Sequence, residues 1–138
     1  PLASYKSFNA YKLFVLDVGL LGALSDLDAQ SILEGNDIFV EFKGALTEQY
    51  VLQQIVSDTP YTPYYFGTDK ATYEQDFLIQ KGKSIVPIEV KAETNIKSKS
   101  LKAFCDKYSP DTAVRFSTMK YINQEWMENI PLYAICNL

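Results

Sequence analysis

Hydrophobic positions follow a helical period in two parts of the chain. The longer part runs from residue 37 to 58, and Pro60 and Pro63 end it. The shorter part, residues 98–108, predicts a second amphipathic helix. In the longer helix the expected apolar stripe consists of Ile38, Phe42, Ala45, Leu46, Leu52, Ile55 and Val56.

Strand-like runs, rich in β-branched and aromatic residues, occupy much of the remaining chain. The first, residues 11–17, leads through Gly19 into a short apolar helix at 20–24. From residue 37 onward the predicted order is α-β-β-β-α-β-β, which indicates a mixed β-sheet flanked by helices, in the α/β (α+β) class. The strands after the first long helix are expected at 64–66, 72–80, 84–92, 112–117 and 131–135.

The turn at Gly82-Lys83 separates two of these runs and predicts a β-hairpin. A two-residue loop with glycine at its first position fixes the strand register, which places Asp76 opposite Glu89. Because side chains alternate between the faces of a strand, Asp76, Glu89 and Lys91 share one face. The other face carries apolar side chains suited to a core, namely Phe77, Ile79, Val86, Ile88 and Val90.

The opposed carboxylates of Asp76 and Glu89 repel one another, so a cation is expected between them. Mg²⁺ suits one or two carboxylates with water and phosphate in its other positions, and it would polarise a phosphodiester and activate a water. Lys91 would orient that water or neutralise developing charge, and Glu48 in the 37–58 helix is the candidate third acid. The competing interpretation is a solvated sheet face with an ordinary Glu89–Lys91 pair, and a Glu48 that reaches solvent.

Composition restricts the available chemistry. At 138 residues the chain fits one domain, and it contains no histidine, which removes imidazole bases, Ser-His triads and imidazole metal sites. Cys105 and Cys136 lack a zinc-site spacing and are expected to be free thiols in a reducing cytoplasm. No segment approaches about 20 consecutive apolar residues, so no membrane helix is predicted. Any catalysis must use carboxylates, lysine, tyrosine or a metal ion held by oxygen.

Charge is distributed unevenly along the chain. The net charge of −4 and the pI of about 4.8 argue against non-specific binding of nucleic acid. Residues 1–90 carry −6, whereas residues 91–138 carry +2. Lysines of the second part are candidate phosphate contacts, although a lysine-rich helix is more often a solvated face. The candidates are Lys97, Lys99, Lys102 and Lys107.

The acids and Lys91 resemble the motif of the PD-(D/E)XK nuclease superfamily. Glu48 stands on a predicted helix, Asp76 on a predicted strand and Glu89-Val90-Lys91 on the next. The resemblance implies a restriction-endonuclease-like fold with an α-β-β-β-α-β core. It also implies that Glu48, Asp76 and Glu89 hold Mg²⁺, for which Mn²⁺ can substitute, and that Lys91 assists the attacking water.

A more specific resemblance covers most of the chain. Five segments are similar, in order, to the C-terminal domain of unknown function of prokaryotic AAA+ family ATPases: KLFVLDVGLL, GALTEQYV, EQDFL, VPIEVK and IPLYAI. Gln75 departs from the aliphatic residue usual at its position. The resemblance implies that residues 1–36 lead from an ATPase domain preceding Pro1, and that residues 37–138 form the nuclease-like domain. The chain has no GxxxxGK[ST] loop of its own.

Three functions remain open from the sequence. The first is a metal-dependent nuclease acting on DNA through the acids and Lys91. The second is a non-catalytic module that senses DNA or a protein partner and regulates the attached ATPase, which the net charge of −4 favours. The third is an assembly role, including oligomerisation, for a surface formed from some of the ten tyrosines and eight phenylalanines.

Overall fold

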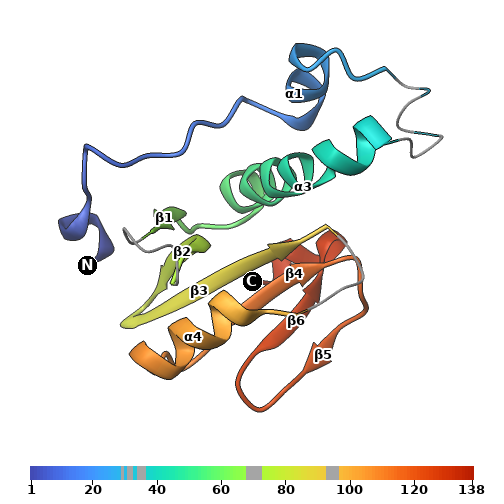
Figure 1. Cartoon of the computed structure of the whole chain (residues 1–138). Helices are drawn as coiled ribbons and strands as arrows, with labels where there is room; N and C mark the ends of the chain where they lie inside the picture. The colour runs from blue at the N-terminus through green and yellow to red at the C-terminus, as the bar shows by residue number, and fades with distance from the viewer. Residues whose placement is uncertain (29, 31–32, 34–36, 68–72, 93–96) are drawn as a thin grey trace.

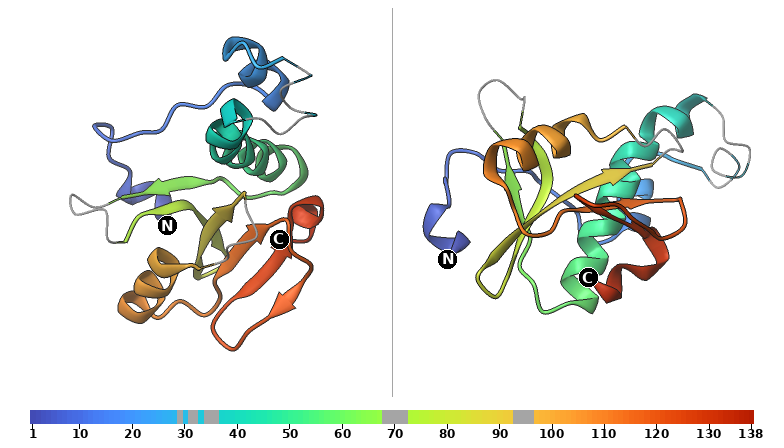
Figure 2. Two further views of the ribbon diagram at one scale, coloured as in Figure 1. Left: turned by 45° about the vertical axis from the view of Figure 1, so that its right-hand side comes forward. Right: turned by 90° about the horizontal axis from the view of Figure 1, so that it is seen from below.

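The computed structural model describes residues 1–28, 30, 33, 37–67, 73–92 and 97–138. It contains one mixed sheet with helices on both faces (Figures 1 and 2). The elements are η1 (Leu2–Tyr5), α1 (Val18–Leu24), α3 (Asp37–Asp58), β1 (Tyr64–Phe66), β2 (Gln75–Lys81), β3 (Ser84–Lys91), α4 (Lys99–Tyr108), β4 (Val114–Ser117), β5 (Ile122–Asn123), β6 (Glu128–Pro131) and η2 (Leu132–Asn137).

The six strands lie in the order β1-β2-β3-β4-β6-β5. Strands β1 to β3 are antiparallel neighbours, whereas β3, β4 and β6 run parallel. The crossover from β3 to β4 passes through α4, as a parallel connection requires. From α3 to β4 the element order is α-β-β-β-α-β, so the predicted mixed sheet flanked by helices is confirmed.

The β2–β3 hairpin has the predicted register. Phe77 pairs with Ile88, and Lys81 pairs with Ser84 beside the turn. Gly82 has φ +63°, a left-handed conformation that glycine adopts without steric cost. The missing N–H of Pro87 does not interrupt a ladder, because pairing with β4 begins only at Ile88.

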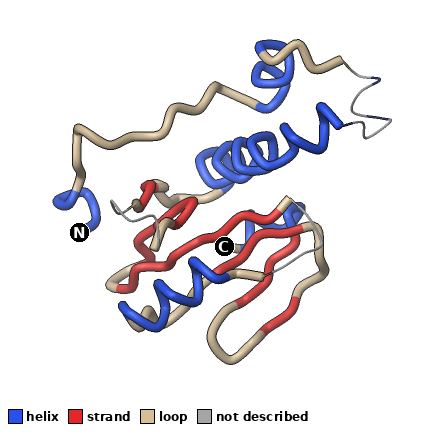
Figure 3. The backbone as a smooth tube through the Cα atoms, in the orientation of Figure 1, coloured by secondary structure: helices blue, strands red, loops and turns tan. Residues whose placement is uncertain are grey.

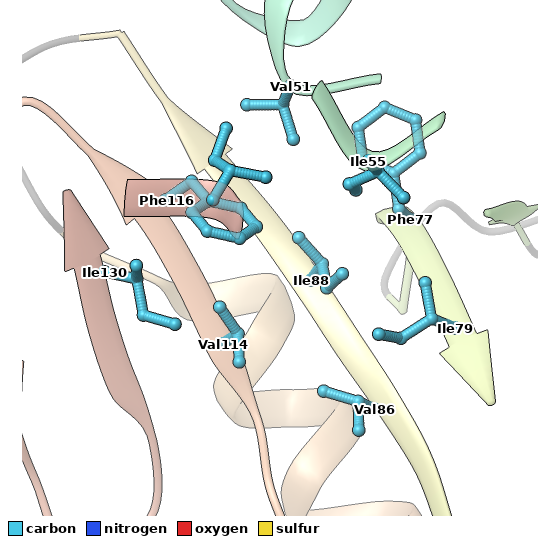
Figure 4. Close-up of a cluster of buried hydrophobic side chains, with 10 residues drawn as sticks. Val51, Ile55, Phe77, Ile79, Val86, Ile88, Val114, Phe116 and Ile130 are labelled. Atoms are coloured by element: carbon cyan, nitrogen blue, oxygen red, sulfur yellow. The ribbon is translucent and has the colours of Figure 1, made fainter. Parts of the chain in front are cut away.

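Alternate residues of the central strands build a core on each face of the sheet. Val51 and Ile55 of α3 pack on one face of the sheet, against the apolar side of the β2–β3 hairpin (Figure 4). The prediction that this side of the hairpin faces a core is confirmed. The strand residues of this core include Phe77, Ile79, Val86, Ile88, Val114, Phe116 and Ile130. Leu101 of α4 packs on the opposite face against Ala113 and Met127. Each strand therefore sends odd and even positions to different helices.

Helix α3 has the predicted bounds, but its buried side differs from the predicted stripe. Ile55 is buried, whereas Ala45 and Val56 are exposed, and Val51 is buried although it is outside the stripe. The side chain of Ile38 lies outside the described residues. The helix contacts the sheet, α1 and η2, so its burial does not follow a single stripe. None of the described helices is both long and apolar enough to cross a bilayer.

The strand predicted at residues 11–17 is wrong. This segment runs as a loop past α3, and helix α1 follows it (Figure 3). Its backbone bonds a side chain rather than a strand: Gln49 accepts from the Val15 N–H at 3.0 Å and donates to the Val15 carbonyl at 2.9 Å. The predicted short helix is present, and Asp17 caps it by accepting from the Leu20 N–H.

The strand predicted at residues 131–135 is also wrong. Strand β6 ends at Pro131, and residues 132–137 form η2. Proline has no N–H to continue the ladder, and its fixed φ suits the residue that precedes a helical turn. Ile135 is 1% exposed and joins the α3 core from η2.

Candidate acidic site at the β2–β3 fork

Asp76 lies where β2 and β3 separate. The ladder ends at the Phe77–Ile88 pair, and beyond it the Val90 N–H donates to Asp76 Oδ2 at 2.7 Å. The carboxylate therefore takes an amide that the backbone of a continuing strand would have bonded. The Asp76 side chain is 27% exposed, so this carboxylate is partly withdrawn from water.

Glu48 approaches the same position from α3. Lys12 Nζ lies 2.7 Å from Glu48 Oε1 and 4.0 Å from Asp76 Oδ1, so one ammonium group joins the two carboxylates. Glu48 is 22% exposed. Its neighbour Gln49 is buried against the N-terminal segment, which aligns this turn of α3 with Lys12.

Glu89 and Lys91 lie on β3, two residues apart and on the same face of the strand. Glu89 is 6% exposed, and its Oε1 lies 2.6 Å from Lys91 Nζ. Its second oxygen, Oε2, is buried and has no hydrogen-bond partner among the described residues. A buried carboxylate oxygen without a partner costs free energy. Among the described residues, Glu89 therefore has one carboxylate oxygen compensated by Lys91 and one without a hydrogen bond.

The electrostatics connect the three acids. The pKa of Asp76 is raised to about 6, first by burial and then by the charges of Glu48 and Glu89, against the Val90 N–H and Lys12, which lower it. The pKa of Asp76 therefore depends on the charges of both other acids. Perturbed carboxyls of this kind are concentrated at functional sites, although ion-pair networks also produce them.

The donor set fits a hard divalent cation in chemical type. Carboxylate oxygens from α3, β2 and β3 are the ligands that Mg²⁺ and Mn²⁺ prefer. In the part of the chain that the structure describes, no three acidic side chains are close enough together to hold a metal ion. Lys12 and Lys91 contact Glu48 and Glu89 instead. Ligation by all three acids would require these lysines to move.

The four lysines predicted to contact phosphate lie on α4 or just before it. Lys97 and Lys99 are exposed near the start of α4, which runs back along β3 from its carboxyl end (Figure 1). Lys102 pairs with Asp106 at 2.6 Å. Lys107, in the last turn of α4, lies over the ring of Tyr73, with its Nζ 4.2 Å from the ring centroid. Two of the four lysines therefore have partners within the domain.

Lys12 was not among the residues predicted for the site. It belongs to a run read as a strand, and no local pattern links it to Glu48, 36 positions away. A cleft of about 1320 Å³ lies between the N-terminal segment and the hairpin, and Lys12 and Tyr65 line it. Lys12 Nζ is 4.7 Å from the centroid of the Tyr65 ring, so this residue connects the cleft to the acids.

Arg115 was also missed. It is 2% exposed on β4, at the position in register with Glu89. Its Nε donates to Asn129 Oδ1 at 2.8 Å, and its Nη1 donates to Ser98 Oγ at 3.2 Å. Burial lowers the pKa of Arg115, and the charge of Glu89 opposes that shift. The available signal was a charged residue between Val114 and Phe116 in an apolar strand.

Comparison with known proteins identifies the family. No curated protein and no solved structure matched the chain. Residues 43–135 match a family described as a domain of unknown function, DUF4143, and this range includes Glu48, Asp76, Glu89 and Lys91 but not Lys12. Because the match covers about two thirds of the sequence, the chain belongs to the DUF4143 family.

Proposed function

We propose that this domain is a metal-dependent phosphodiesterase of the nuclease type, acting on DNA at the β2–β3 fork. The observation that carries the proposal is the position of Asp76. Its partly buried carboxylate is fixed by the Val90 N–H, and its pKa is raised to about 6 by burial and by two further acids. Such an arrangement concentrates negative charge, which a divalent cation would relieve.

Asp76, Glu89 and Glu48 would hold Mg²⁺, or Mn²⁺ in its place. When bound, the ion would polarise the phosphodiester and lower the pKa of the attacking water. Lys91 is 32% exposed, so its ammonium can turn between Glu89 and solvent. Released from Glu89, it would orient the water or neutralise charge that develops on the phosphate.

Two energetic features favour a functional site over a structural one. Ionisation of Asp76 at neutral pH costs about 3 kcal/mol, because burial and the neighbouring acids raise its pKa to about 6. Glu89 keeps one buried oxygen without a hydrogen-bond partner in the described part of the chain. A protein that needed only the fold would gain stability from neutral residues at both positions.

Calorimetric titration of Mn²⁺ into the wild type and Asp76→Asn tests the proposal directly. Asparagine keeps the acceptor for the Val90 N–H but removes the charge, so binding should be lost. Asp106→Asn, an exposed acid on α4, is the control and should bind as the wild type does. Absence of binding to the wild type at millimolar Mn²⁺, with and without a DNA oligonucleotide, would refute the proposal.

Cleavage is then tested on labelled single- and double-stranded DNA. Lys91→Met should retain Mn²⁺ binding and lose cleavage by about 100-fold or more, because it removes the catalytic cation and leaves the ligands. Unchanged cleavage by Lys91→Met would exclude this role for Lys91.

The finer assignment is also part of the proposal. The motif Glu48, Asp76 and Glu89-Val90-Lys91 and the element order of the core support a PD-(D/E)XK-type, restriction-endonuclease-like domain. The similarity to the C-terminal domain of AAA+ ATPases supports a role in partnership with an ATPase domain.

The second candidate is a non-catalytic module that binds DNA or a protein and regulates an ATPase. It is favoured by the net charge of −4 and by the lysines that already pair with Glu48 and Glu89. Combined substitution of Asp76→Asn and Lys91→Met in the natural full-length protein separates the candidates. A nuclease would lose its cellular function, whereas a regulator would keep it.

A further inference from the structure

We propose that Lys12 is the resident cation of the acidic site, and that a divalent metal ion must displace its ammonium group to bind Glu48 and Asp76. This inference rests on the proposed function, because it assumes that the carboxylates bind metal. It adds to the site a residue that precedes the family match at 43–135. It also makes metal binding depend on the N-terminal segment.

The position of the ammonium group supports this role. Lys12 Nζ lies 2.7 Å from Glu48 Oε1 and 4.0 Å from Asp76 Oδ1, although the two acids come from different elements, α3 and β2. Bridging two such carboxylates is what a metal ion would do at this site. The Lys12 ammonium also faces the Tyr65 ring, so carboxylates and an aromatic face surround it.

The N-terminal segment holds Lys12 close to the acids. Gln49 is 2% exposed and bonds both the N–H and the carbonyl of Val15. Gln53 Oε1 accepts from the Val18 N–H at 3.1 Å. The backbone is therefore fixed three residues beyond Lys12, which keeps the local concentration of its ammonium near Glu48 high.

The Lys12 ammonium compensates its two carboxylates incompletely. Lys12 brings one positive charge to Glu48 and Asp76, whereas Glu89 has Lys91 at 2.6 Å and Arg115 in register on β4. A divalent ion in place of Lys12 would match the two negative charges of Glu48 and Asp76. Exchange of Lys12 for metal is therefore favoured by charge and opposed by the tether.

Competition of this kind couples metal binding to the N-terminal segment. Metal should free Lys12 and loosen residues 10–18, whereas contacts that fix this segment on α3 should weaken metal binding by the same factor. A partner that lifts the segment would thereby increase the affinity of the site for metal. Lys12 thus sets the threshold concentration at which the site is occupied.

Calorimetric titration of Mn²⁺ tests this with three variants beside the wild type. Lys12→Met keeps the aliphatic stem and removes the charge, and it should bind Mn²⁺ about tenfold more tightly. Lys12→Arg retains a competing cation, and Lys6→Met removes a charge from the same segment, where Lys6 lies over Tyr64. Both should bind within about twofold of the wild type.

Hydrogen exchange on the wild type provides a measurement that needs no variant. The amides of Val15 and Val18, which donate to Gln49 and Gln53, should exchange faster when Mn²⁺ is added, and in Lys12→Met they should already exchange fast without it. This readout holds even if a variant folds poorly.

The outcomes separate this inference from the proposed function. Tighter binding by Lys12→Met, with faster exchange in the wild type on adding Mn²⁺, supports both. Equal affinities in the wild type and Lys12→Met, with binding still abolished by Asp76→Asn, would overturn the role of Lys12 and leave the metal site intact. Absence of binding in every variant would overturn both.

Discussion

Val90 donates its backbone N–H to the carboxylate of Asp76 at 2.7 Å, so a side chain closes the fork between β2 and β3. This bond fixes the direction of Asp76 toward the side from which Lys12 and Glu48 approach. Burial raises the pKa of this carboxyl, whereas the hydrogen bond from Val90 lowers it and so favours the charged form. The arrangement stores free energy that a ligand could recover.

Asp76 should reduce stability at neutral pH. Its folded pKa of about 6 is above its ordinary value, so its contribution to stability is full below the ordinary pKa and is lost as pH rises through about 6. Asp76→Asn should therefore raise the free energy of unfolding at pH 8 by up to about 3 kcal/mol, with little effect at pH 4. Urea unfolding at the two pH values measures this. A variant that is less stable than the wild type at pH 8 would contradict the assigned environment of Asp76.

Metal affinity should depend on pH through the same carboxyl. Protons compete with Mn²⁺ for Asp76, so affinity should be nearly constant above pH 7 and fall by about tenfold per pH unit below about 6. Calorimetry at pH 5, 6, 7 and 8 checks the profile. The charges of Glu48, Lys12 and Glu89 act on Asp76, so Glu48→Gln should be measured in parallel. Removal of the Glu48 charge should move the inflection to lower pH.

The buried side of α3 can be tested on two valines of one helix. Val51 is 0% exposed and Val56 is 63% exposed. Val51→Ala should cost about 1.5–3 kcal/mol in the free energy of unfolding, because it removes two buried methyl groups and leaves a cavity. Val56→Ala should change it by less than about 0.5 kcal/mol. The reverse order of the two effects would support the stripe expected from the sequence and reject the observed packing.

Arg115 should be needed for the burial of Glu89. The two residues occupy paired positions on β4 and β3, and both are nearly inaccessible to solvent. Arg115→Met removes a buried cation and leaves Glu89 with less compensation, so unfolding should become easier by about 3 kcal/mol or more. Glu89→Gln in the same chain should restore part of the loss. Lys102→Met removes a half-exposed lysine whose ion pair with Asp106 lies at the surface, so it should have no measurable effect on thermal unfolding.

Periodicity and turn chemistry predicted much of the fold. The bounds of α3, the register around Gly82-Lys83 and the division of the hairpin into two faces all followed from neighbours within a few residues. The period of two that grouped Asp76 with Glu89 is a local property of strands. These features depend on short-range geometry, which the order of residues specifies directly.

The tertiary structure decided the remainder, because it depends on which surfaces meet. Residues 11–17 have the composition of a strand, yet Gln49 of α3 takes the hydrogen bonds of Val15. Helix α4 covers the face of β3 that carries Glu89, and Arg115 arrives in register from β4. Lys12 reaches Glu48 across 36 positions of sequence. Side chains this far apart in the sequence meet only when whole elements pack. Burial then shifts the pKa values of these side chains in a way that no local pattern encodes.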